Sequence, residues 1–187
     1  MKKKALQIEN ANKPYLQELL DLFANPGSHP NAFLVGPELQ EAGRSLTKFV
    51  VESTPPPDLP PGKDAWVTNE EQGFVMHVLS SALEKLPGAI ESLSDLFEAA
   101  MRLGPLLVHE YAHKKNKEGI GDELVGEPEA EAAQNRAEQD LASRYEKEIG
   151  ARLKAIDGIT KLSSELDSIG CRKYSDVLDV VLSKIRD

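Results

Sequence analysis

Cysteine and tryptophan are nearly absent from this chain of 187 residues, which has only Cys171 and Trp66. A single cysteine cannot form an internal disulfide, and it excludes a cysteine-rich zinc module. It is typical of a protein from a reducing compartment. No apolar run approaches the roughly 18 residues that a membrane-spanning helix needs. Residues 5–10 do not form the apolar core of a signal peptide. We therefore expect a soluble cytoplasmic protein that has no membrane partner.

Positive charge is also scarce. The chain has 22 Lys and Arg against 31 Asp and Glu, a net charge of −9. This balance argues against sequence-specific binding to nucleic acid, because such binders normally have a basic face. The acidic residues are concentrated in residues 118–148, where ten Asp and Glu stand against three Lys and Arg. Such a stretch is typical of a solvated helix face, and it could also contact a basic partner.

Apolar residues recur at helical spacing along most of the chain. The pattern predicts a mostly α fold, a multi-helix bundle of about eight helices with a long helix towards the C-terminus at residues 128–156, and little or no β-sheet. Residues 32–35 are the best strand candidate. Residues 48–51 have strand propensity, but the longer pattern around them favours a helix. Proline at position 105, after Gly104, predicts a break or kink.

Prolines are most concentrated at residues 55–61, which contain five of the twelve prolines in the chain. Because proline fixes the backbone angle φ and removes an amide donor, we expect a stiff connector there. This predicts an N-terminal helical segment at residues 1–54, a connector at 55–65 and a main helical domain at 66–187. A single domain covering residues 1–187 is the alternative.

One short motif suggests chemistry: His109-Glu110-Tyr111-Ala112-His113 has the pattern H-E-x-x-H. Residues four apart lie on one face of a helix, so the two imidazoles can point at one metal ion. The glutamate between them can act as a general base towards a water on that metal. A third protein ligand is needed to complete such a site.

The motif resembles that of the zincin metallopeptidases, in particular the gluzincin branch. The resemblance implies zinc held by His109 and His113, with Glu110 as the general base. It also implies a third ligand from a glutamate on the next helix. By spacing, Glu131 matches that position best, and Glu127 lies one turn earlier on the same helical face.

Two further expectations come from the resemblance. Zincins bind their substrate along an edge strand that precedes the metal-binding helix, and residues 32–35 are the only candidate here. Their helix normally continues through the core after the second histidine. Lys114 and Lys115 in this chain instead predict a wet helix end, with positive charge near the metal.

The same residues also allow a non-catalytic interpretation. His109 and His113 could simply line a helix–helix contact, with Glu110 paired to Lys114. The protein would then be an acidic helical interaction protein that covers a basic protein surface as an inhibitor, adaptor or assembly factor. The alanine-rich stripe of residues 128–156 could form the seam of a homodimer. We expect His77, which lies among apolar residues, to be a satisfied core or boundary histidine.

Overall fold

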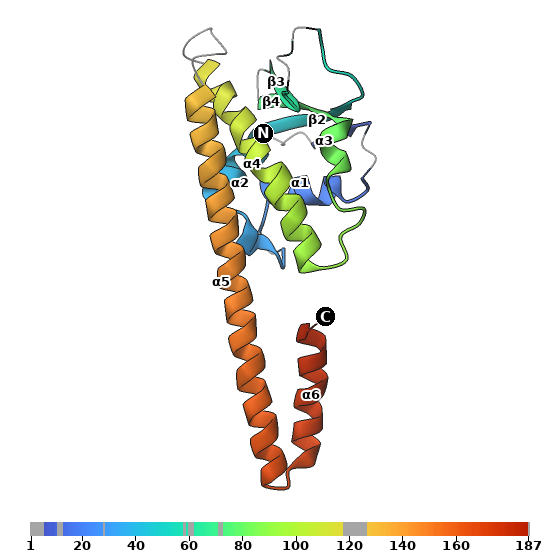
Figure 1. Cartoon of the computed structure of the whole chain (residues 1–187), viewed down its shortest axis with the longest axis vertical. Coiled ribbons are helices and arrows are strands. Elements are labelled where there is room, and N and C mark those ends of the chain that lie inside the picture. The colour runs from blue at the N-terminus through green and yellow to red at the C-terminus, as the bar shows by residue number, and fades with distance from the viewer. Residues whose placement is uncertain are drawn as a thin grey trace. The chain divides into compact units, whose positions relative to one another are not determined.

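A computed structural model describes residues 6–10, 13–27, 29–57, 59, 62–70, 73–117 and 127–186 (Figure 1). Residues 1–5 and 118–126, which include the start of the acidic stretch, lie outside this description. The chain divides into two compact units, Met1–Ala142 and Ser143–Asp187. None of the described helices is long and apolar enough to cross a membrane.

The expectation of an almost purely helical bundle is wrong. The described residues form six α-helices and a four-stranded mixed sheet, 66% helix and 13% strand. The strands are β1 (Gln7–Glu9), β2 (Leu46–Glu52), β3 (Ala65–Glu70) and β4 (Gly73–Leu79). The helices are α1 (Leu16–Ala24), α2 (Pro37–Ser45), α3 (Ser80–Glu84), α4 (Leu93–Lys117), α5 (Glu127–Ser168) and α6 (Arg172–Arg186), with a 3₁₀ turn η1 (Ala32–Leu34).

The sheet has the order β1-β2-β4-β3, with β1, β2 and β4 parallel and β3 antiparallel to β4. The strands on the two sides of the proline-rich connector, β2 and β4, pair with each other. The predicted N-terminal segment, residues 1–54, and the start of the predicted main domain, residues 66–187, therefore contribute strands to one sheet within the first unit. Residues 32–35, the predicted strand, form the 3₁₀ turn instead.

Two segments with helical apolar spacing are strands because both faces of a central strand are buried. In β4, residues 73–76 and Val78 are all buried. A short apolar run of this kind satisfies a helical template as well as a strand template. Phe49, Val50 and Val51 in β2 are also buried, and their bulky side chains favour the extended backbone.

One face of the sheet forms the core with the helices. Phe49, Phe74 and Met76 are fully buried on this face. Helix α4 contacts both β3 and β4, and α2 contacts α1 and α4. Figure 1 shows these helices gathered on one side of the sheet. The sheet thus supports α4, the helix that contains the H-E-x-x-H motif.

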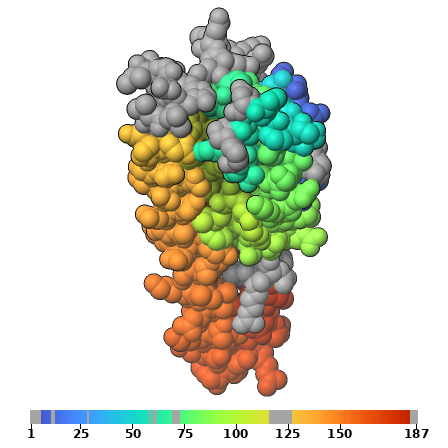
Figure 2. Space-filling model, turned by 45° about the horizontal axis from the view of Figure 1, so that its top comes forward, coloured from blue at the N-terminus to red at the C-terminus, as the bar shows by residue number. Residues whose placement is uncertain are grey.

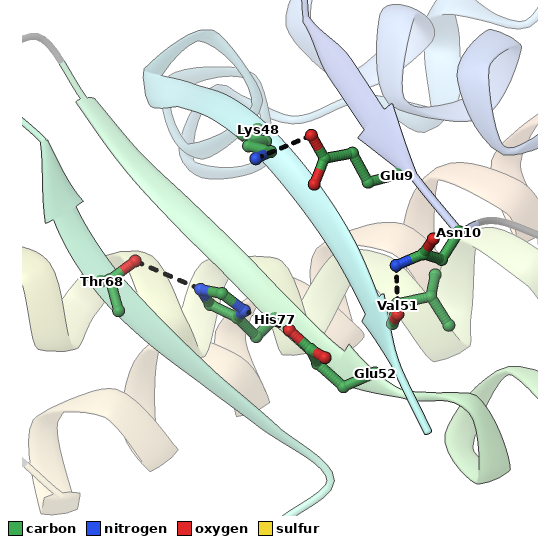
Figure 3. A network of polar contacts seen from close by, with 7 residues as sticks. All are labelled: Glu9, Asn10, Lys48, Val51, Glu52, Thr68 and His77. Carbon is green, nitrogen blue, oxygen red and sulfur yellow. Dashed lines mark hydrogen bonds and ion pairs between the residues drawn. The ribbon is translucent and has the colours of Figure 1, made fainter. Parts of the chain in front are cut away.

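The other face has a network of polar contacts (Figure 3). Lys48 Nζ lies 2.8 Å from Glu9 Oε1. His77 lies between Glu52 Oε1, 3.1 Å from Nδ1, and Thr68 Oγ1, 3.2 Å from Nε2. The ring of His77 also stacks on Trp66, with centroids 5.1 Å apart. Both nitrogens of His77 have partners, as expected of a boundary histidine.

Helix α4 runs without interruption through Gly104 and Pro105, so the predicted break is wrong. It begins after a reciprocal cap, in which Ser92 N donates to Asp95 Oδ2 and Asp95 N donates to Ser92 Oγ. A Cβ at Gly104 would lie 3.2 Å from Leu141 of α5. The missing side chain therefore leaves room for the end of the Leu141 side chain, and in Figure 2 the yellow and orange atoms of the first part of α5 lie against the green atoms of α4.

The alanine stripe expected to form a dimer seam is used inside the first unit. Ala130, Ala133, Ala137 and Leu141 are all buried, with exposed fractions of 6% or less. These side chains therefore pack within the chain, and this stripe of residues 128–141 is not exposed to a second copy.

Candidate metal centre

The two histidines of the motif lie on one face of α4, as the four-residue spacing predicts. His109 is almost fully buried, with 7% of its side chain exposed, and His113 is 14% exposed. Their Nε2 atoms are 3.1 Å apart. The imidazoles therefore direct the same nitrogen towards one point near the end of α4.

A carboxylate from the next helix completes the cluster. Glu127 is the first residue of α5, and its oxygens lie 3.2 Å from His113 Nε2 and 3.7 Å from His109 Nε2. Among the described residues, His109, His113 and Glu127 form a group whose ligand atoms all lie within 4.8 Å of one another. A group of two histidines and one glutamate is geometrically able to hold a metal ion.

The spacing of these atoms suits zinc. Zinc binds imidazole nitrogen and carboxylate oxygen at about 2.0–2.2 Å, usually in a tetrahedral arrangement. Two ligand atoms of such a tetrahedron are then separated by roughly 3.3–3.5 Å. The separations of 3.1, 3.2 and 3.7 Å lie around this value. The carboxylate reaches His113 with Oε2 and His109 with Oε1, so its two oxygens and the two Nε2 atoms surround one point at roughly the spacing of zinc ligands.

The protonation states of the cluster are also those that a metal requires. Burial, followed by the neighbouring His113, lowers the pKa of His109, so its imidazole is neutral at neutral pH. The hydrogen bond from Lys63 lowers the pKa of Glu127, so its carboxylate stays ionised. Neutral imidazole and ionised carboxylate are the forms that coordinate metal ions.

Lys63 contacts this cluster, and the sequence did not indicate that it would. Its ammonium group pairs with Oε1 of Glu127. The lysine lies two residues before β3, in the proline-rich connector, where nothing in the local pattern distinguishes it from a solvated charge. In the structure it supplies one positive charge to the carboxylate that would otherwise face a metal ion.

Glu131, expected as the third ligand, is not part of the cluster. It is exposed on α5, one turn beyond Glu127, although its charge is near enough to raise the pKa of His109. Of the two candidates on this helical face, the earlier one, Glu127, lies beside the histidines.

Glu110, expected as the general base, follows His109 on α4 and is 5% exposed. Its carboxyl group is therefore shielded from bulk water, one residue after the first candidate ligand. Its predicted partner in the non-catalytic reading, Lys114, lies near the ring of Tyr111, with its Nζ 5.9 Å from the centroid.

The other residues near the motif point away from the cluster. Tyr111 donates its hydroxyl to Glu41 at 3.0 Å, and Lys115 lies 2.9 Å from the same carboxylate. On a helix, position 111 is nearly opposite 109 and 113. The charge of Lys115 is therefore compensated by Glu41 on the far side of α4, away from the metal ligands.

Comparison with known proteins found no matching family model, curated protein or solved structure.

The two glutamates of α5 provide a matched test of the ligand set. We expect Glu127→Gln to weaken zinc binding by at least about tenfold, since even the partners that support metal ligands are worth that much. Glu131→Gln removes the same charge from the same helix and is expected to have a much smaller effect. Titration against a chromophoric chelator measures both affinities. A larger loss in Glu131→Gln would contradict the assignment.

Lys63 and a metal ion would compete for the same carboxylate. Because like charges repel, Lys63→Gln is expected to raise zinc affinity by about two- to fivefold, the scale of a partly exposed ion pair. Lys85→Gln, which removes a lysine paired with Asp64 on the surface, is the control and should leave the affinity unchanged. Equal or weaker zinc binding in Lys63→Gln would show that the lysine does not oppose the metal.

Proposed function

We propose that this protein is a small zinc-dependent peptidase. The observation that carries the proposal is the convergence of His109, His113 and Glu127 on a helix in which the buried Glu110 directly follows the first histidine. A helix with the H-E-x-x-H pattern and a glutamate from the following helix are the parts by which gluzincins hold zinc. The proposed ligand set differs from the sequence-based expectation only in its third member.

The bound zinc would supply a Lewis acid and lower the pKa of a water molecule towards 7. Glu110 would accept a proton from the water while the water oxygen attacks the peptide carbonyl carbon. The same carboxyl group would then give a proton to the amine nitrogen as the C–N bond breaks. This assignment requires Glu110 to be ionised before the attack and protonated between the two transfers.

The sheet supports a peptide as substrate. In the described sheet β3 is an outer strand, pairing with β4 on one side only, and it contacts α4. Lys63, two residues before the start of β3, touches the proposed ligand Glu127. The beginning of the strand therefore lies next to the metal centre. An extended peptide can add to a sheet edge through backbone hydrogen bonds, which would bring its carbonyl groups past this point.

The test compares the zinc-loaded protein with its Glu110→Gln variant on a mixture of unstructured peptides, with mass spectrometry to detect cleavage. We expect the wild type to cleave and the variant to lose at least about a hundredfold in rate, since general-base catalysis contributes 10²–10⁴-fold. Zinc content and thermal stability of the variant are measured in parallel, so that a lost ion or a lost fold is recognised.

A matched control is Glu129→Gln, which changes an exposed carboxylate in the first turn of α5 and should retain activity. Cleavage that survives in Glu110→Gln would contradict the proposed role of that residue. A wild-type protein that binds zinc but cleaves no peptide would contradict the peptidase and leave a structural metal site. The acidic interaction protein is the function that would then be favoured.

A further inference from the structure

The second unit is a helical hairpin with almost no core of its own. It consists of the later part of α5, a turn through Gly170 with φ of 79°, and α6, which returns beside α5 (Figure 1). Of the described side chains in this unit, only Ser163, Ser175 and Leu182 are buried. Ser163 and Ser175 hydrogen-bond to each other at 3.0 Å, and Ser163 donates to Asp179. Polar contacts therefore hold the helices together where an apolar core is expected.

The apolar side chains of the hairpin are exposed instead, and most of them share one side. Relative to Ser163, residues 162 and 166 of α5 stand at positions −1 and +3, and residue 169, which follows the end of α5 and still donates its N–H to Glu165 O, stands at +6. Relative to Ser175, residues 174, 178 and 181 stand at the same positions of α6. Because the helices are antiparallel, equal offsets from the facing serines place both sets on the same side of the hairpin. We call this the hairpin face: Leu162, Leu166, Ile169, Tyr174, Leu178 and Val181.

The exposure of the hairpin face is large. Four of its members are 48%, 72%, 68% and 39% exposed: Leu162, Ile169, Tyr174 and Val181. A fully exposed large apolar side chain presents on the order of 150–200 Å². The four therefore offer roughly 400 Å² of apolar surface, in the range that marks an interaction site on a soluble protein.

The same side of α5 continues as a row of small residues. Ala151, Ala155 and Gly158 follow the helical line of the hairpin face, and all three are exposed. A Cβ added at Gly158 would meet nothing within 4 Å. The surface is thus bulky near the turn, at Ile169 and Tyr174, and flat farther from it.

We propose that the hairpin face binds a second copy of this chain, and that the two hairpins pack antiparallel as a four-helix bundle. A two-fold axis through the face would place the bulky turn of each copy over the small residues of the other, so that the surface is complementary to itself. None of these residues is charged, so two like faces meet without repulsion. The apolar area of roughly 400 Å² is about half of the roughly 800 Å² per partner of a standard interface, and the small residues beside it add to the contact. Helical hairpins commonly complete their cores in this way.

Two pairs of substitutions test the proposal on the full-length protein. Val181→Glu and Leu162→Glu place a charge on the hairpin face. Val180→Glu and Leu153→Glu change equally apolar residues, 57% and 60% exposed, that lie on the opposite side of the same helices. Circular dichroism shows whether each variant retains its helices.

Sedimentation equilibrium measures the mass across a range of protein concentrations. We expect a dimer for the wild type and for Val180→Glu and Leu153→Glu, and a monomer for Val181→Glu and Leu162→Glu. A wild-type monomer at all concentrations would overturn the proposal and leave the face to another partner. Dissociation by the control substitutions to the same degree, or a dimer that survives both face substitutions, would also overturn it.

Discussion

The candidate metal centre depends on one constraint: the end of α4 and the first residue of α5 must meet. His109 and His113 lie near the end of α4, and Glu127 begins α5. The sheet packs against α4, and the Leu141 side chain of α5 packs over Gly104 of α4. The distances of 3.1–3.7 Å between the ligand atoms follow from that arrangement. Loss of packing at either helix would separate ligands that are distant in the sequence.

The electrostatics of the centre are arranged for a cation before any metal is considered. A carboxylate with a lowered pKa lies beside the two imidazoles, one of which, His109, also has a lowered pKa, and a lysine from the connector compensates the carboxylate. Lys63 is long and about one-third exposed, so it can leave the carboxylate at small cost. Lys115, which the sequence placed near the metal, is bound to Glu41 on the other side of α4. Of these two lysines, Lys63 is the one that faces the candidate ligands.

The sequence predicted the local geometry of the motif better than it predicted the fold. The four-residue spacing of His109 and His113 was sufficient to place both on one helical face, because that inference uses local geometry alone. The strand β4 was not recognised, because a strand buried on both faces has no period-2 alternation. The spacing favoured Glu131, whereas Glu127 lies in the cluster, because the choice depends on where α5 begins relative to α4. Lys63 reaches the site through the tertiary fold, which leaves no trace in its local sequence.

The central claim is that His109, His113 and Glu127 bind zinc together. X-ray absorption spectroscopy of protein loaded with one equivalent of zinc tests it most directly, because the spectrum reports the type and distance of the ligands. The account predicts nitrogen and oxygen ligands at about 2.0–2.2 Å, with the multiple scattering of two imidazoles. Spectra of zinc coordinated by water alone, or a sulfur ligand at about 2.3 Å from Cys171, would contradict it.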